Sequence, residues 1–263
     1  MDYSISRETY RRSASRITMI AHLFGVTAII LLLVWLLHYR EGLNIESDDP
    51  YRIFNVHPFL MFIGFIFLAG EGKKLLFLFY CISIFAFISL FFVTNNWLVC
   101  WMVHAGAIRA AMMAYKTVPA EHQVQKFLHM FVHLAAICLG IVGIHAVFKF
   151  HDRQNLTNMY SLHSWIGMGT FCLFILQWLF GLSTFLFPQA SSLTRARALP
   201  WHVCGGRALL YMAICAAETG LMEKFGFLRL QHGREAHLIN FLGLAILLFG
   251  ITVDLSVALA RYV

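Results

Sequence analysis

The chain is dominated by apolar runs that are each long enough to cross a lipid bilayer. A membrane-spanning helix needs about 20 predominantly apolar residues. With the apolar stretch 75–115 set aside for the moment, six such runs lie at residues 17–38, 53–70, 127–148, 162–187, 202–221 and 237–260. Charged residues make up only 13% of the chain, against about 25% in soluble domains. Because helices satisfy their own backbone hydrogen bonds in lipid, the sequence predicts an all-α integral membrane protein with six spans.

The charges between the runs predict how the spans are oriented. Cations that share one side of a six-span chain lie in residues 1–16, in the loop 116–126, at Arg195 and Arg197, and at Arg261. An acidic loop at residues 41–49 falls on the other side. Cytoplasmic loops are enriched in Lys and Arg, so we expect residues 1–16 to be a cytoplasmic segment and both termini to be cytoplasmic. The net charge of +7 forms no basic stripe, which argues against nucleic acid binding.

Four histidines lie just inside the amino ends of successive runs: His57, His129, His163 and His202. An ionisable ring inside hydrocarbon is costly and indicates a functional site. Successive helices start on alternating sides, so one pair falls near the non-cytoplasmic face (His57, His163) and the other near the cytoplasmic face (His129, His202). Two imidazoles per face suit the axial positions of a heme iron, whereas zinc needs three or four protein ligands. We interpret the pattern as two bis-histidine hemes.

Neighbouring residues leave two questions open. His133 lies four residues after His129 on the same helix face and competes with it as the ligand. Gly167 and Gly206 each follow a histidine by four residues, where a glycine lets a flat macrocycle approach the backbone. Glycines also close ordinary helix packing in membranes, and the sequence does not separate these two explanations.

The residues around these histidines resemble the cytochrome b561 family. The matching stretches are residues 54–58 (FNVHP), 159–167 (MYSLHSWIG), 177–181 (QWLFG), 185–188 (FLFP) and 200–203 (PWHV). The resemblance implies a six-helix bundle, usually a homodimer, with two heme b groups. It further implies electron transfer from cytoplasmic ascorbate to monodehydroascorbate or a ferric chelate across an endomembrane, vesicle, lysosomal or plasma membrane.

The resemblance also assigns roles to single residues. His57 and His163 match the non-cytoplasmic heme ligands, and His129 and His202 match the cytoplasmic pair. Cations that match or flank the ascorbate site are Lys126, Arg195, Lys116 and Arg197. Ascorbate is anionic, which suits Lys and Arg, although Gln125 stands where some members have a further lysine. Candidates for the acceptor side are Asn55, Phe150 and His151.

One segment departs from the family pattern. The motif that ends the second family helix is divided here between residues 70–71 (GE) and residues 111–116 (AMMAYK). Residues 72–110 are therefore an apolar insertion within the cytochrome b561 domain at residues 17–260. Two explanations remain open: a translated intron or gene-model error, and an additional helical hairpin that turns near Asn95.

Two other classes of function compete with electron transfer. In a proton or small-solute transporter the histidines would act as relays, and Glu218 and Asp254 would then matter. A purely structural membrane protein would leave four matched histidines unexplained. The presence of a b-type visible spectrum distinguishes electron transfer from both alternatives.

Overall fold

The structure is a computed structural model that describes residues 2–68 and 122–259. Helices joined by short loops account for this part of the chain, and it contains no strands. The elements are α1 (Asp2–Val34), η1 (Trp35–Tyr39), α2 (Pro50–Leu60), η2 (Met61–Leu68), α5 (His122–Gln154), α6 (Leu162–Gly181), η3 (Leu182–Leu186), α7 (Ser192–Phe227) and α8 (Arg234–Leu259). The three segments η1, η2 and η3 are π-helical continuations of the helices before them.

The chain divides into two compact units. The first unit comprises residues 1–70 and 133–263, and the second comprises residues 71–132. All packing described below belongs to the first unit. Lys126 and His129 lie in the second unit, while the insertion at 72–110 and Lys116 lie outside the described residues.

Five of the described helical segments are long and apolar enough to cross a membrane. They are Arg16–Tyr39, Pro50–Leu68, His129–Gln154, Leu162–Leu186 and Arg234–Leu259. The sixth predicted span, residues 202–221, lies within the 36-residue helix α7 but is not one of these five; it carries Arg207 and Glu218. The all-α membrane fold predicted from the sequence is thereby confirmed.

Several helices extend beyond the apolar runs that predict them. Residues 2–16 belong to α1, residues 149–153 extend α5, and residues 192–201 form the start of α7. Hydropathy identifies only the part of a helix that lies in lipid. Polar turns can continue the same helix into water, since backbone hydrogen bonding does not stop at the membrane surface. The helices are therefore longer than the apolar runs.

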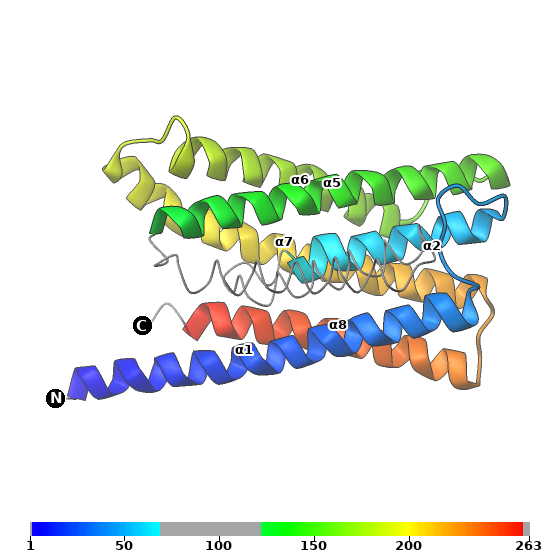
Figure 1. Ribbon diagram of the computed structural model, residues 1–263, viewed down its shortest axis with the longest axis horizontal. Coiled ribbons are helices and arrows are strands. Elements are labelled where there is room, and N and C mark those ends of the chain that lie inside the picture. The colour runs from blue at the N-terminus through cyan, green and yellow to red at the C-terminus, as the bar shows by residue number, and fades with distance from the viewer. Residues whose placement is uncertain (1, 69–121, 260–263) are drawn as a thin grey trace, which may run out of the picture. The chain divides into compact units, whose positions relative to one another are not determined.

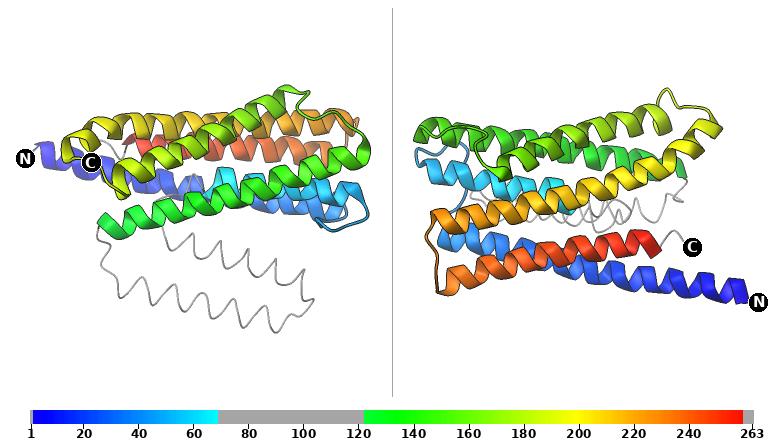
Figure 2. Two further views of the ribbon diagram at one scale, coloured as in Figure 1. Left: turned by 90° about the horizontal axis from the view of Figure 1, so that it is seen from above. Right: turned by 180° about the vertical axis from the view of Figure 1, so that it is seen from behind.

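Within the first unit, the helices pack as antiparallel neighbours (Figure 1, Figure 2). Near one end of the α1–α8 pair, Thr18 Oγ1 and Ser256 Oγ share a hydrogen bond of 2.6 Å. Beyond the other end, Trp35 Nε1 donates to Glu235 Oε1 at 2.9 Å, and Arg40 forms an ion pair with the same carboxylate. These polar contacts lie at both ends of the pair and fix the register of α1 against α8.

The side chain of Asp254 on α8 pairs with polar residues of α7 inside the predicted membrane spans. Asp254 is buried and forms an ion pair with Arg207, whose Nη2 donates to Oδ2 at 2.9 Å. Tyr211 Oη donates to the same oxygen at 3.0 Å. Ionisable groups inside a membrane are usually paired in this way. Asp254 is therefore a structural link between α7 and α8, which removes it from the proposed set of relays.

We expect Asp254→Leu to destabilise the protein by about 1–3 kcal/mol, because it leaves the Arg207 guanidinium without its carboxylate. Thermal unfolding of the detergent-solubilised protein, followed by circular dichroism, measures the loss. The double variant Arg207→Leu/Asp254→Leu should recover most of it, since neither charge is then unpaired. If the two single losses simply add in the double variant, the pair does not link the helices.

Candidate functional site

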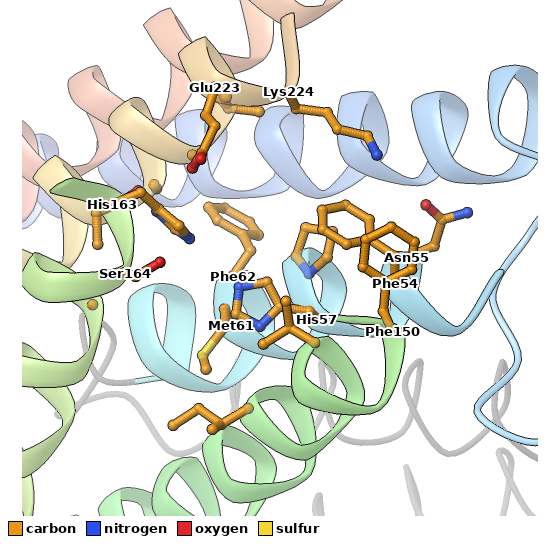
Figure 3. Close-up of a pocket in the computed structure, with 18 of the residues that line it drawn as sticks. Phe54, Asn55, His57, Met61, Phe62, Phe150, His163, Ser164, Glu223 and Lys224 are labelled. Atoms are coloured by element: carbon orange, nitrogen blue, oxygen red, sulfur yellow. The ribbon is translucent and has the colours of Figure 1, made fainter. Parts of the chain in front are cut away.

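Two of the predicted histidines face each other inside the first unit. His57 belongs to α2, which begins at Pro50 and whose first turn is capped by Asp49, a side chain that accepts from Tyr51 N–H. His163 is the second residue of α6, whose N-cap is Ser161. The two ring centroids are 6.0 Å apart and the ring planes are nearly perpendicular, at 87° (Figure 3). Helix starts that lie far apart in the sequence are thus brought together at one end of the unit.

Backbone carbonyls fix the outer nitrogen of each ring. Nδ1 of His57 lies 3.0 Å from the carbonyl oxygen of Gly143, and Nδ1 of His163 lies 2.8 Å from that of Ala216. A carbonyl only accepts, so both Nδ1 atoms carry a proton and both Nε2 atoms keep a lone pair. Metal-binding histidines are oriented by this kind of hydrogen bond. The two rings are therefore held in the tautomer that binds a metal.

The spacing of the rings fits one metal ion between them. Two metal–imidazole bonds of about 2 Å each, together with the radius of each ring, span about 6 Å. Within the described residues, no group of three or more His, Cys, Asp or Glu side chains could hold a metal ion. A zinc site would need such a group, whereas a heme iron takes its other four ligands from the porphyrin. The donor set fits a bis-histidine heme.

A large cavity surrounds the histidine pair. Its volume is about 720 Å³, within the range of cofactor sites. Most of its wall is apolar, and Phe62, Phe65 and Phe171 line it on the side away from the loops. Gly167 also lines the cavity, and a Cβ added to it would meet no atom within 4 Å. The space beside this glycine is open to a flat ligand, which favours the first of the two explanations that the sequence left open.

Aromatic residues cover the cavity at its loop end. Phe54 lies 5.1 Å from Phe150 and Tyr51 lies 5.7 Å from Phe150, measured between ring centroids. His151 lines the same cavity, and its Nδ1 lies 2.8 Å from Asn158 Oδ1. Two of the predicted acceptor-side residues, Phe150 and His151, are thus placed at the mouth of the histidine pair's cavity.

The third acceptor-side candidate, Asn55, also lines the cavity but has a structural contact. It is buried, and its Nδ2 donates to the carbonyl oxygens of Arg40 at 2.9 Å and Gly42 at 2.6 Å. Gly42 has a positive φ of 89°, which favours glycine. Asn55 therefore ties the loop after η1 to α2 and shapes the cavity rim.

Sequence reasoning missed three polar residues at this mouth: Lys224, Glu223 and Tyr160. Tyr160 Oη donates to Glu223 Oε1 at 3.1 Å, and burial together with this carboxylate raises the pKa of Tyr160. Lys224 Nζ lies 3.9 Å from the centroid of the Phe54 ring. Burial, and next the nearby charge of Arg40, lower the pKa of Lys224 to about 8. In the sequence Glu223 and Lys224 look like ordinary loop charges, whereas Tyr160 lies in the matching stretch 159–167 without a role of its own.

His202 lies at the opposite end of the α6–α7 pair. Its Nδ1 lies 3.1 Å from Gln177 Nε2, and the same amide donates to the His202 carbonyl oxygen at 2.6 Å. The Phe185 ring centroid is 5.2 Å away. A Cβ added at Gly206 would meet no atom within 4 Å, as at Gly167. The predicted alternation of histidines between the two ends is therefore observed for the three that lie in the first unit.

A repeated register relates α6 and α7. Gly181 follows His163 by about five helical turns, and Gly220 follows His202 by the same number of positions. An added Cβ at Gly181 would lie 2.8 Å from Cε1 of His202, and one at Gly220 would lie 2.8 Å from Cε1 of His163. Each helix thus carries a histidine at one end and, about 27 Å along its axis, a glycine that admits the other helix's histidine.

The polar partners of the histidines follow the same register. Gln177, the partner of His202, lies about four helical turns after His163. Ala216, the partner of His163, follows His202 by the same number of positions. The α6–α7 pair therefore has approximate two-fold symmetry, which places one histidine-binding position at each end.

The remaining predicted residues lie near loops. Arg195 Nη1 donates to the Ala190 carbonyl oxygen at 2.6 Å and braces the loop before α7. Arg197 is exposed. Lys126 and His129 belong to the second unit.

Comparisons with known proteins identify a family. The sequence pattern described as eukaryotic cytochrome b561 matches residues 96–228. A probable ascorbate-specific transmembrane electron transporter of Oryza sativa subsp. japonica is 37% identical over 91% of this chain and 88% of its own length. A transmembrane ascorbate ferrireductase of Arabidopsis thaliana is 36% identical over 94% and 88%, and a transmembrane ascorbate-dependent reductase of Sus scrofa is 32% identical over 89% and 78%. With a histidine pair that fits a heme and relatives that match it over most of its length, the chain belongs to the eukaryotic cytochrome b561 family.

Proposed function

We propose that the protein is a transmembrane oxidoreductase that moves single electrons from cytoplasmic ascorbate to an acceptor on the other side of the membrane. The observation that carries the proposal is the His57–His163 pair, held at 6.0 Å with both Nδ1 atoms on carbonyl oxygens. The names of the relatives, which refer to ascorbate-dependent electron transport and ferric reduction, support the same activity.

Two heme b groups per chain are the cofactors of this proposal. Bound heme supplies reversible one-electron oxidation and reduction of its iron. His57 and His163 would hold the non-cytoplasmic heme, and His129 and His202 the cytoplasmic one. The cavity around His57 and His163 provides mostly apolar surroundings for the first of these hemes.

The register of the helices favours His129 over His133 as the cytoplasmic ligand. Gly143, whose carbonyl oxygen contacts His57, lies about four helical turns after His129 on α5. The partner positions on α6 and α7 follow a ligand histidine by the same interval. His133 lies one turn closer to Gly143, which breaks the pattern. His133 instead stacks edge-on against Phe174, with 5.4 Å between ring centroids.

The acceptor would approach the cavity mouth near Phe150 and His151, beside the structural residue Asn55. Monodehydroascorbate and a ferric chelate are the two acceptor classes of the proposal. The chain would act as a homodimer in an endomembrane, vesicle, lysosomal or plasma membrane, with both termini in the cytoplasm. The insertion at 72–110 stays a separate hypothesis: tryptic peptides from residues 75–109 in the native protein would exclude a translated intron.

Ascorbate would be bound by Lys126 and Arg195, assisted by Lys116 and Arg197. We expect Arg195→Ala to raise the ascorbate concentration needed for half-reduction by roughly ten- to a hundredfold, because a hydrogen bond to a charged group contributes about 1.5–3 kcal/mol. The measurement is the absorbance of the reduced b-type heme during an ascorbate titration of the purified protein. Dithionite, which needs no docking site, should still reduce the variant fully.

Arg195 also braces the loop through Ala190, so Lys126→Ala provides an independent check of the donor site. Higher salt should weaken ascorbate reduction of the wild type more than of the Lys126→Ala/Arg195→Ala variant, because salt screens exposed charges. Reduction of both single variants at the wild-type ascorbate concentration would rule out this donor site. A purified, folded protein without any heme spectrum would contradict the function as a whole.

The transporter alternative finds less support. A proton or solute relay needs a connected series of polar groups. The carboxylate of Asp254 instead forms an ion pair with Arg207 and accepts a hydrogen bond from Tyr211. Glu218 Oε1 is buried and has no hydrogen-bond partner within the described part of the chain. An isolated carboxyl group does not make a relay.

A further inference from the structure

Lys224 has an unusual position among the charged residues that line the cavity. Its ammonium group lies 3.9 Å from the centroid of Phe54 and 5.7 Å from that of Tyr51. No carboxylate lies within ion-pair distance of it in the residues that the structure describes. Burial of its side chain, with the positive charge of Arg40 nearby, lowers the pKa of Lys224 to about 8. A cation in this position gains stability from an anion that enters the cavity.

The neighbouring carboxylates are already occupied. Glu223 accepts from Tyr160 Oη at 3.1 Å and from Ser161 Oγ at 3.2 Å. Glu235 accepts from Trp35 and pairs with Arg40. Glu235 acts on Lys224 only through its charge, without an ion pair, and partly offsets the lowering of the Lys224 pKa. Neither carboxylate forms an ion pair with Lys224 in the described residues, so its ammonium group can accept an anion that enters the cavity.

The position of Lys224 relative to the histidine pair limits what that anion can be. Lys224 lies four residues after Gly220, whose backbone abuts the His163 ring, so it is one helical turn further toward the loops. Phe54 lies three residues before His57, again about one turn toward the loops. Figure 3 shows the Lys224 ammonium on the side of the cavity where Phe54 and Asn55 lie, while His57 and His163 flank its centre. Lys224 and Phe54 thus meet just beyond the two rings, at the water side.

We propose that Lys224, seated on the ring of Phe54, binds a carboxylate of the heme held by His57 and His163 and thereby fixes the orientation of that heme. This inference rests on the proposed function, since it requires a heme between the two rings. Heme is an apolar disc whose charge is confined to two carboxylates at one edge. Burial of an unpaired charge in lipid is costly, so that edge would turn toward the loops, where Lys224 offers a charge-assisted hydrogen bond.

The experiment compares heme with heme dimethyl ester, which lacks the charged carboxylates. Both are titrated into full-length protein that was produced under heme limitation, in a His202→Ala background so that the non-cytoplasmic site is filled alone. The variants are Lys224→Met, which keeps the length and apolar stem of the side chain, and Lys224→Arg, which keeps the charge. Lys149→Met is the matched control, because Lys149 Nζ donates to the Ile45 carbonyl oxygen at 2.8 Å and does not line the cavity.

We expect Lys224→Met to weaken heme binding about tenfold and to leave the binding of the ester unchanged, because only heme loses a charged hydrogen bond. Lys224→Arg should restore most of the preference for heme, and Lys149→Met should match the parent. Equal weakening of heme and ester would overturn the proposal, as would no weakening of either. An effect of Lys224→Met on a carboxylate substrate, with the heme-to-ester ratio unchanged, would assign the cation to that substrate and also overturn it. Failure of the parent to bind heme at all would instead contradict the proposed function.

Discussion

We expect replacement of His57 or His163 with alanine to remove the same heme and to leave the other reducible by ascorbate. In the proposed function these two rings, 6.0 Å apart, supply the two axial ligands of one heme. Loss of either ring removes one of the two bonds between protein and iron in a cavity of about 720 Å³ and should weaken heme binding strongly. We expect loss of one of two hemes per chain, measured by pyridine hemochrome content and by the reduced-minus-oxidised spectrum. His202→Ala and His129→Ala should each remove the spectral component of the second heme.

His133→Ala is the matched control for this series, because it removes a nearby imidazole on α5 that the helix register disfavours as a ligand. It should retain both hemes. Loss of the cytoplasmic heme in His133→Ala, with retention in His129→Ala, would exchange the two assignments. If His163→Ala and His202→Ala abolish one common component, the pairing of histidines by membrane side is wrong.

We expect valine at Gly220 or at Gly181 to eliminate one heme each although neither substitution replaces a proposed ligand. A Cβ at Gly220 would lie 2.8 Å from Cε1 and 2.9 Å from Nδ1 of His163, closer than real side chains approach. His163 must then move away and lose its hydrogen bond to the Ala216 carbonyl oxygen. Gly220→Val should abolish the His57/His163 heme. Gly181→Val, which contacts His202 in the same way, should abolish the other heme.

Gly226→Val provides the control, since Gly226 lies on the same helix α7 and an added Cβ there meets nothing within 4 Å. All three substitutions carry the same small change in helix propensity, of less than about 1 kcal/mol. Heme content per folded protein therefore reports the steric effect alone. Retention of both hemes by Gly220→Val, or loss of both by Gly226→Val, would show that the glycines do not create the histidine positions.

The sequence by itself predicted the membrane fold and the alternation of the histidines between the two ends of the helices. Runs of about 20 apolar residues require transmembrane helices, and consecutive helices must alternate in direction. His57 and His163 therefore had to reach one face, and His202 the other. The same reasoning misplaced the helix ends at residues 2–16, 149–153 and 192–201, because hydropathy detects the lipid boundary and not the last hydrogen-bonded turn.

Only the tertiary structure decided how the histidines are held and what surrounds them. The carbonyl oxygens that fix the Nδ1 atoms belong to residues 86 and 53 positions away in the chain. Sequence reasoning assigned no role to Gly181, Gly220 or Lys224, and the structure places them against His202, His163 and Phe54. Hydropathy and the alternation of helix direction depend on the order of residues along the chain, so both can be predicted from the sequence. A hydrogen bond or a close approach between two helices depends on their rotation and relative height, which no local pattern of residues encodes.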